Sequence, residues 1–151
     1  AANSRNLIIR NSGAVRPWQH VLDSLSGYLL LGQKLLEGNK NFADSWNFGP
    51  EPETAISVER LICLAAKHWK KINYRKVANK SNLHETECLL LDSSRARRKL
   101  QWRPIWNTET ALLKTINWYM AFYENKEISS VSDIESYVQD ACQQNAIWVN
   151  Q

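Results

Sequence analysis

An arginine next to a proline, followed closely by a tryptophan and a histidine, is the densest group of chemically capable side chains in this sequence. Arg16, Trp18 and His20 lie between a turn and a helical pattern. Pro17 disfavours helical backbone at the residue before it, so we expect Arg16 to be extended. A guanidinium can grip two phosphate oxygens, while the tryptophan offers an aromatic face and the histidine a titratable ring. The pattern predicts a phosphate-binding site at a strand end, where ligands of α/β folds bind.

A structural interpretation of the same residues stays open. Arg16 could pair with Asp23 or Asp44 and only stiffen the turn, and Trp18 could belong to the core. Residue types alone favour this second interpretation, because most such clusters serve packing and local hydrogen bonding.

The elements that must position these residues follow from hydrophobic periodicity, which indicates an α/β fold with a small sheet and a helical C-terminal half. We expect strands at 7–9, 45–48 and 88–91 and helices at 21–36, 58–69, 92–100, 108–123 and from 132 onward. The inner faces expected for the last two helices are Leu112, Ile116, Tyr119 and Tyr123, then Ile134, Tyr137, Val138 and Ala141. Three short strands hardly make a self-sufficient sheet, so either helices cover both faces or the chain completes a core supplied by something else.

Composition excludes several classes of protein. The 151 residues suit one domain, and no apolar run approaches the length of a membrane span. None of the five glycines forms a G-x-G, so no dinucleotide fingerprint is present. Three widely spaced cysteines match neither a disulfide framework nor a zinc knuckle, and we expect buried free thiols. We therefore expect a cytoplasmic protein with no metal and no membrane contact.

Two basic stretches of the sequence suggest an alternative function. Six lysines and arginines between Lys67 and Lys80 lie among Trp69 and Tyr74, and a second group runs from Arg95 to Arg103. Basic patches with interleaved aromatic residues are typical of nucleic-acid binding. The net charge of +4 is modest for that role, so nucleic acid is the minor hypothesis.

A collinear set of motifs resembles the CDP-glucose 4,6-dehydratases of the extended short-chain dehydrogenase/reductase superfamily. The matching stretches, within residues 5 to 125, are Arg-Pro-Trp-Gln-His-Val-Leu at 16–22, Leu-Ser-Gly-Tyr-Leu-Leu-Leu at 25–31, Trp-Asn-Phe-Gly-Pro at 46–50, His-Glu at 84–85, Leu-Leu-Leu-Asp-Ser-Ser-Arg-Ala at 89–96, Leu-Gln-Trp-Arg-Pro at 100–104 and Thr-Ile-Asn-Trp-Tyr at 115–119. The resemblance implies a small C-terminal, substrate-binding lobe at 1–125, with the Rossmann core largely absent and a helical extension at 126–151.

The resemblance also implies an activity and its partners. The family oxidises C4 of CDP-glucose with NAD, removes water across C5 and C6, and returns hydride to C6, giving CDP-4-dehydro-6-deoxyglucose for deoxysugar and polysaccharide synthesis. Its members are homo-oligomers, and their NAD loop and Tyr-x-x-x-Lys lie in an N-terminal Rossmann domain. No tyrosine here is followed by lysine at the fourth position. We therefore expect this chain to bind no NAD and to be inactive alone, and a non-catalytic interaction module is the other alternative.

The site residues that the resemblance implies are all substrate-binding, with none assigned to catalysis, cofactor or metal. They are Arg16 against the diphosphate, then Trp18, His20, Asn47, His84 and Glu85. For Asn47 a backbone-bonding role at a strand end is an equal alternative. Asn82 and Leu83 depart from the Arg-Gly that precedes the histidine in relatives, which puts a second phosphate-binding arginine in doubt. Gln101 replaces a glycine, so we expect a positive φ there.

Overall fold

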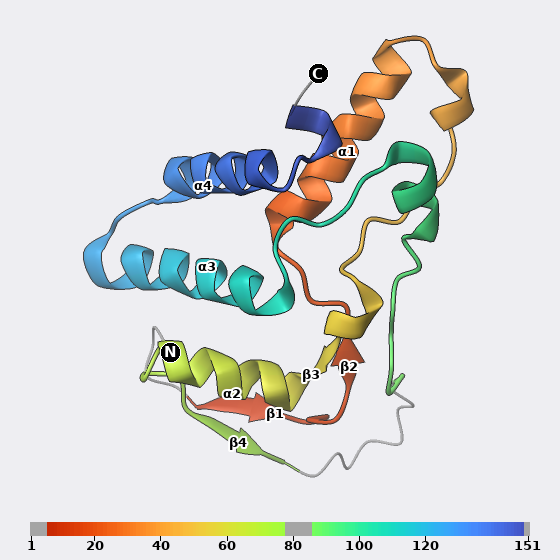
Figure 1. Cartoon of the computed structure of the whole chain (residues 1–151). Helices are drawn as coiled ribbons and strands as arrows, with labels where there is room; N and C mark the ends of the chain where they lie inside the picture. Colours follow the sequence, from red (N-terminus) through yellow and green to blue (C-terminus); the bar gives the residue numbers. More distant parts are fainter. Residues whose placement is uncertain (1–5, 78–85, 150–151) are drawn as a thin grey trace.

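The computed structural model describes residues 6–77 and 86–149 as helices joined by short strands and loops (Figure 1). The α-helices are α1 (Val21–Leu36), α2 (Val58–His68), α3 (Thr108–Met120) and α4 (Ser130–Gln143). The strands are β1 (Leu7–Ile9), β2 (Val15–Arg16), β3 (Ile56–Ser57) and β4 (Tyr74–Lys76). Single helical turns are η1 (Lys40–Phe42), η2 (Pro52–Thr54), η3 (Ala96–Leu100), η4 (Ala121–Asn125) and η5 (Ile147–Val149). The expected class, α/β with few short strands, is confirmed.

The strands form two separate pairs. β1 lies parallel to β4, with Leu7 opposite Tyr74, and β2 lies antiparallel to β3, with Val15 opposite Ser57. Two-stranded pairs of this length are marginal alone, so the helices must stabilise them. In Figure 1, α2 covers the β1–β4 pair, and α3 and α4 lie together beyond it. β3 and β4 were not predicted, because neither short run has the alternating pattern of a half-buried strand.

Two predicted strands are wrong. Residues 45–48 form no ladder: Arg95 lies over the ring of Trp46, and Asn47 donates to the backbone oxygen of Asp92. Side-chain contacts therefore hold this segment. Residues 88–91 make one isolated bridge, from Cys88 to Val15, and their leucines at 89 and 90 are exposed, not buried.

Helix starts follow local capping chemistry. Ser57 accepts a hydrogen bond from Arg60 N at the start of α2, and Asn107 Oδ1 accepts one from Thr110 N at the start of α3. The predicted opening of the last helix at residue 132 is wrong by two residues, since α4 begins at Ser130. The positive φ expected at Gln101 is confirmed, at 54°.

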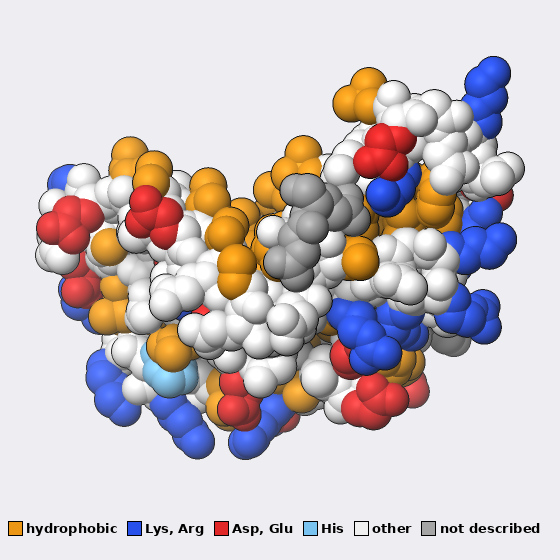
Figure 2. Space-filling model, turned by 45° about the horizontal axis from the view of Figure 1, so that its top comes forward, with side chains coloured by type: hydrophobic (Ala, Val, Ile, Leu, Met, Phe, Trp, Pro, Cys, Tyr) orange, Lys and Arg blue, Asp and Glu red, His pale blue; other side chains and the backbone are white. Residues whose placement is uncertain are grey.

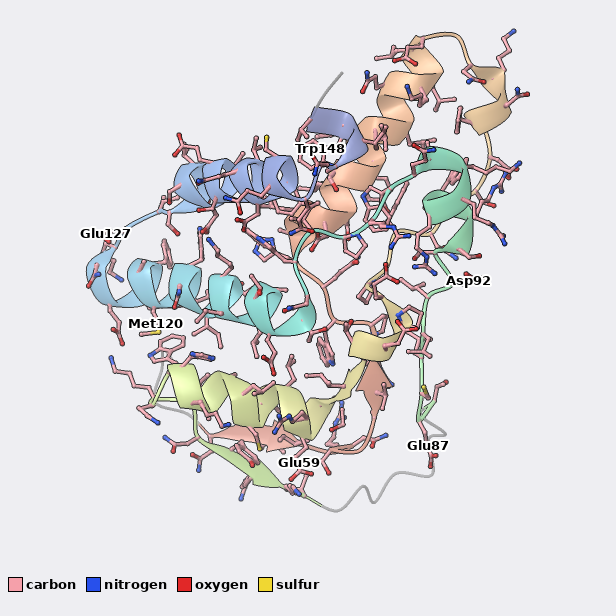
Figure 3. All side chains as sticks on the ribbon, viewed as in Figure 1. Glu59, Glu87, Asp92, Met120, Glu127 and Trp148 are labelled. Carbon is pink, nitrogen blue, oxygen red and sulfur yellow. The ribbon has the colours of Figure 1, made fainter. Side chains whose placement is uncertain are left out.

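The core consists of three clusters rich in aromatic residues. One centres on Phe48 and Trp102, one on Trp106 and Tyr137, and one on Trp69. Trp148, which lies in η5 after α4 and is labelled in Figure 3, packs against the first two clusters. Residues from α3 and α4 thus share one core with the loop after η3.

Several expected burials are wrong. Tyr119 and Tyr123 of the third helix and Ile134 and Val138 of the fourth are substantially exposed, while Ile116, Tyr137 and Ala141 are buried. Of the free cysteines, Cys63 is half-buried, and Cys88 and Cys142 are exposed. Helical periodicity locates the apolar stripe of each helix, but not how far the neighbouring element covers it.

The apolar stripe of α1 is largely exposed. It comprises Val21, Leu25, Tyr28, Leu29, Leu35 and Leu36, whereas the buried residues of the helix are Asp23, Ser26, Gly27 and Leu30. In Figure 2, hydrophobic side chains gather along the upper part of the view, while lysine and arginine collect along its lower and right edges. No described helix is long and apolar enough to cross a membrane.

Candidate functional site

Arg16 lies in β2, extended as predicted, and its side chain is tied to the backbone. Nη1 donates to Val15 O at 2.8 Å and to Thr86 O at 3.0 Å. Within the described ranges, Nε and Nη2 have no hydrogen-bond partner, which leaves two donors for a ligand. The predicted alternative, a pair with Asp23 or Asp44, does not form: Asp44 pairs with Arg95, and Asp23 accepts from backbone amides and a tyrosine.

A surface cavity of about 250 Å³ lies beside Arg16 and contains a second arginine. Arg10 and Asn11, at the end of β1, line it together with Arg16, and Ile9 and Val58 contribute apolar wall. Arg10 and Asn11 were not predicted as site residues. Their position directly after a strand was the available signal, since ligands gather at the carboxyl ends of strands.

Trp18 and His20 occupy different surroundings from Arg16. The indole Nε1 of Trp18 donates to Ile56 O at 3.0 Å, which fastens this segment to β3. His20 is 9% exposed and is the N-cap of α1, where its Nδ1 accepts from Leu22 N at 3.3 Å. Its ring lies edge-on to that of Trp106, with centroids 4.7 Å apart.

The protonation of His20 follows from this burial. Desolvation lowers the pKa of His20 below its ordinary value, and Lys114 acts in the same direction, while Asp133 opposes them. The ring is therefore neutral near pH 7. It lines a second cavity, between α1, α3 and α4, and not the cavity beside Arg16.

The side chain of Asn47 forms a hydrogen bond to the backbone of a distant loop. Its Nδ2 donates to Asp92 O at 3.3 Å, and close by Gly49 N donates to Ser93 Oγ at 2.7 Å. Figure 3 labels Asp92 where the chain enters η3. The geometry matches the backbone-bonding alternative, although no strand ends at Asn47. His84 and Glu85 lie outside the described residues; Thr86, the next residue, contacts Arg16.

A buried polar network that the sequence did not reveal fixes the start of α1. Asp23 is fully buried, and its Oδ1 accepts from Ile105 N at 2.7 Å and from the hydroxyl of Tyr137 at 2.8 Å. Ser26 Oγ accepts from Trp102 Nε1 at 3.0 Å. Burial raises the pKa of Asp23, partly offset by these hydrogen bonds. The network joins the segment after His20 to the η3–α3 loop and to α4.

The basic stretches are partly neutralised. Lys71 pairs with Glu124 and Lys76 with Glu59. Arg95 pairs with Asp44, and the hydrogen bond from Arg95 lowers the pKa of Asp44 to about 2. These pairs reduce the positive field available to a polyanion.

The described chain is a small α/β lobe in which an arginine from the end of a short strand reaches a surface cavity. It is 34% identical over 138 residues to the CDP-glucose 4,6-dehydratase of Salmonella typhimurium. That alignment covers 90% of this chain but 38% of the relative, so the chain spans less than half the length of that curated protein. The resemblance predicted from the motifs is confirmed. No family model matches the chain.

An alignment of this length in a chain of 151 residues cannot end at residue 125. It includes at least part of the segment after Glu127, where α4 supplies Tyr137 to the Asp23 network. The similarity thus reaches beyond the motifs that revealed it.

Proposed function

We propose that this chain is the C-terminal, nucleotide-sugar-binding portion of a CDP-glucose 4,6-dehydratase. The observation that carries the proposal is the 34% identity along nine tenths of the chain to a protein of that name. The whole enzyme would convert CDP-glucose to CDP-4-dehydro-6-deoxyglucose, in the cytoplasm and as a homo-oligomer, as the resemblance implies.

In this proposal Arg16 binds the diphosphate. Two of its donors are uncommitted among the described residues, and Pro17 and the contacts of Nη1 limit its freedom, so little ordering entropy is lost on binding. Arg10 and Asn11 line the same cavity and would add a second cation and an amide to it. A planar guanidinium fork matches phosphate oxygens better than a lysine does. Trp18 holds the segment that carries Arg16 against β3 through its hydrogen bond to Ile56 O. His84 and Glu85 would border the nucleotide.

NAD, which the family uses, does not fit the residues of this chain. A dinucleotide loop needs closely spaced glycines so that the backbone can approach the pyrophosphate. Here the ring of Phe48 occupies the space beside Gly27, and the side chain of Leu91 occupies the space beside Gly49. No G-x-G occurs in the sequence. We propose that the redox step uses residues outside this chain and that the chain alone is inactive.

The exposed apolar stripe of α1 would then pack against the remainder of the dehydratase. Exposed leucines on one helix face are costly in water, and contiguous apolar surface marks interaction sites. The Rossmann portion of the same enzyme is the partner that the proposal supplies.

The test is a titration of CDP into a chimera in which this chain replaces the matching stretch of the Salmonella enzyme. Arg16→Ala should weaken CDP binding roughly tenfold or more, because each charge-assisted hydrogen bond contributes ~1.5–3 kcal/mol. Arg16→Lys should recover only part of the affinity. Unchanged affinity with a lower melting temperature would mean that Arg16 is structural.

A further inference from the structure

A cavity of about 430 Å³ lies between the loop that follows η3 and the turn that follows α4. This volume is within the usual range for small-molecule sites. Gln144 Nε2 donates to Ile105 O at 3.1 Å, which joins the two segments that form the wall. None of the described residues that were predicted to bind the nucleotide sugar lines this cavity.

The wall combines apolar and polar side chains. Pro104, Ile147 and Trp148 can cover the body of a small organic molecule, while Gln101 and Arg103 carry hydrogen-bond donors. The indole Nε1 of Trp148 is buried and has no acceptor within the described ranges, so this N–H reports on any oxygen that a ligand brings near it. A cavity of this composition suits a ligand with an apolar body and a polar end.

Arg103 is the charged group of the wall that is available to a ligand. It is exposed, and in the part of the chain that the structure describes it forms no ion pair. Glu51, the other charged residue of the wall, has its Oε2 3.4 Å from Arg97 Nη1, which offsets its charge. Arg98 and Lys99 of η3 are exposed and add to the positive field. The cavity therefore favours an anion.

Gln101 and Asn145 line the cavity with a backbone conformation that favours glycine. Their φ angles are 54° and 53°, and the third non-glycine residue with a positive φ in the described ranges is Lys126. Gln101 follows the end of η3, a position where glycine is usual, and it replaces the glycine of the dehydratases that the sequence resembles. Backbone strain of this kind gathers at ligand sites, and glutamine adds an amide that glycine cannot supply.

We propose that this cavity binds a small organic carboxylate through Arg103 and Gln101. The guanidinium fork meets the two carboxylate oxygens in one plane, the Gln101 amide donates to one of them, and the apolar body of the ligand packs on Pro104 and Ile147. A phosphate would bring a second negative charge close to Glu51, so a singly charged carboxylate suits the site better. The proposal goes beyond the proposed function, because Arg16 does not line this cavity.

Phenylacetate and phenylacetamide form a matched pair of probes, because they have nearly the same shape and differ in charge. Titrations of the 151-residue chain at low salt are followed by the NMR signal of the Trp148 indole N–H. Phenylacetate should bind roughly tenfold more tightly than phenylacetamide, since charge-assisted hydrogen bonds are the stronger ones. Neither probe carries a nucleotide, so failure here would leave the proposed function untouched.

A variant of the arginine and a matched control locate the effect. Arg103→Gln should abolish the preference for phenylacetate, because the side chain no longer carries a charge. Arg98→Gln removes a positive charge from the neighbouring η3, at an exposed residue that does not line the cavity, and should keep the preference.

Gln101→Gly separates binding from folding. Glycine adopts a positive φ without strain, so the melting temperature should rise by roughly 2–4 °C. The affinity for phenylacetate should fall about fivefold with the loss of the amide donor. Equal affinity for both probes, a Trp148 signal that does not shift, a preference that survives in Arg103→Gln, or unchanged affinity in Gln101→Gly would overturn the proposal.

Discussion

The two faces of α1 reverse the usual arrangement of a surface helix. The side toward the lobe carries Asp23, Ser26, Gly27 and Leu30, while the side toward solvent carries most of the leucines, with Leu29 75% exposed and Leu36 91% exposed. The inner face is stabilised by the close packing of the Phe48 ring against Gly27 and by a buried hydrogen-bond network, more than by buried apolar area. The outer face has the composition of a core surface, and none of the residues that the structure describes covers it. Polar residues can therefore mark the inside of a helix when their partners lie far away in the sequence.

The largest expected effect comes from removing the anchor of the inner face. Asp23→Ala leaves the amides of Ile105 and Trp106 without their acceptor, while the hydroxyl of Tyr137 keeps only its hydrogen bond to Ser26 Oγ. We expect the free energy of unfolding to fall by roughly 2–6 kcal/mol, because each of these two buried unsatisfied donors costs ~1–3 kcal/mol. Urea denaturation measures it. Tyr137→Phe removes one donor from the same carboxylate and should cost only about 1 kcal/mol; equal losses in both variants would contradict the network.

Leu29 and Leu30 are neighbours in sequence on opposite faces. Leu30 is 2% exposed and packs in the Phe48–Trp102 cluster. Leu30→Ala should lower the free energy of unfolding by about 2–5 kcal/mol, through lost burial and a cavity. Leu29→Ala should change it by less than ~0.5 kcal/mol. Two denaturation curves check the contrast, and a similar cost for both would mean that the outer face is covered in solution.

Gly27 and Gly32 of α1 differ in how much space surrounds them, and this difference distinguishes the inner face of the helix from the outer face. A Cβ at residue 27 would lie 2.3 Å from a ring carbon of Phe48, whereas one at residue 32 meets nothing within 4 Å. Gly27→Ala should destabilise by about 1–3 kcal/mol through overpacking. Gly32→Ala should stabilise by roughly 0.5–1 kcal/mol, since alanine favours helix. Melting temperatures that move in the same direction would refute this assignment of faces.

The smallest effect depends on pH. Because burial lowers the pKa of His20 below 6.5, the unfolded chain takes up the proton first as pH falls. The stabilisation from neutral His20 is thus present above pH 6.5 and is lost below it, with a slope of at most ~1.4 kcal/mol per pH unit. His20→Asn keeps an N-cap acceptor and should flatten this part of the stability–pH curve. A curve with an unchanged slope would show that His20 is not desolvated.

Local chemistry made part of the fold predictable. The bounds of α1 and the positive φ at Gln101 depend on neighbouring residues and were right. The predicted strand at residues 45–48 failed because β structure needs a partner, and Trp46 finds Phe42 and Arg95 instead.

The candidate site was predictable only where one segment carries it. The extended backbone of Arg16 follows from Pro17, its neighbour in the sequence. The Asp23–Tyr137 contact joins residues 114 positions apart, and no periodicity in the sequence points to it. Arg10 shares the Arg16 cavity because residues of β1 and β2, which belong to two different strand pairs, both line it, which is a property of the folded chain.

The most direct test of the proposed function is turnover by the chimera that joins this chain to the uncovered part of the Salmonella enzyme. With CDP-glucose and NAD, we expect CDP-4-dehydro-6-deoxyglucose to form, and Arg16→Ala to reduce kcat/KM by roughly tenfold or more. The isolated 151-residue chain should give no product. A folded, CDP-binding chimera without turnover, or turnover by the chain alone, would contradict the assignment of this lobe.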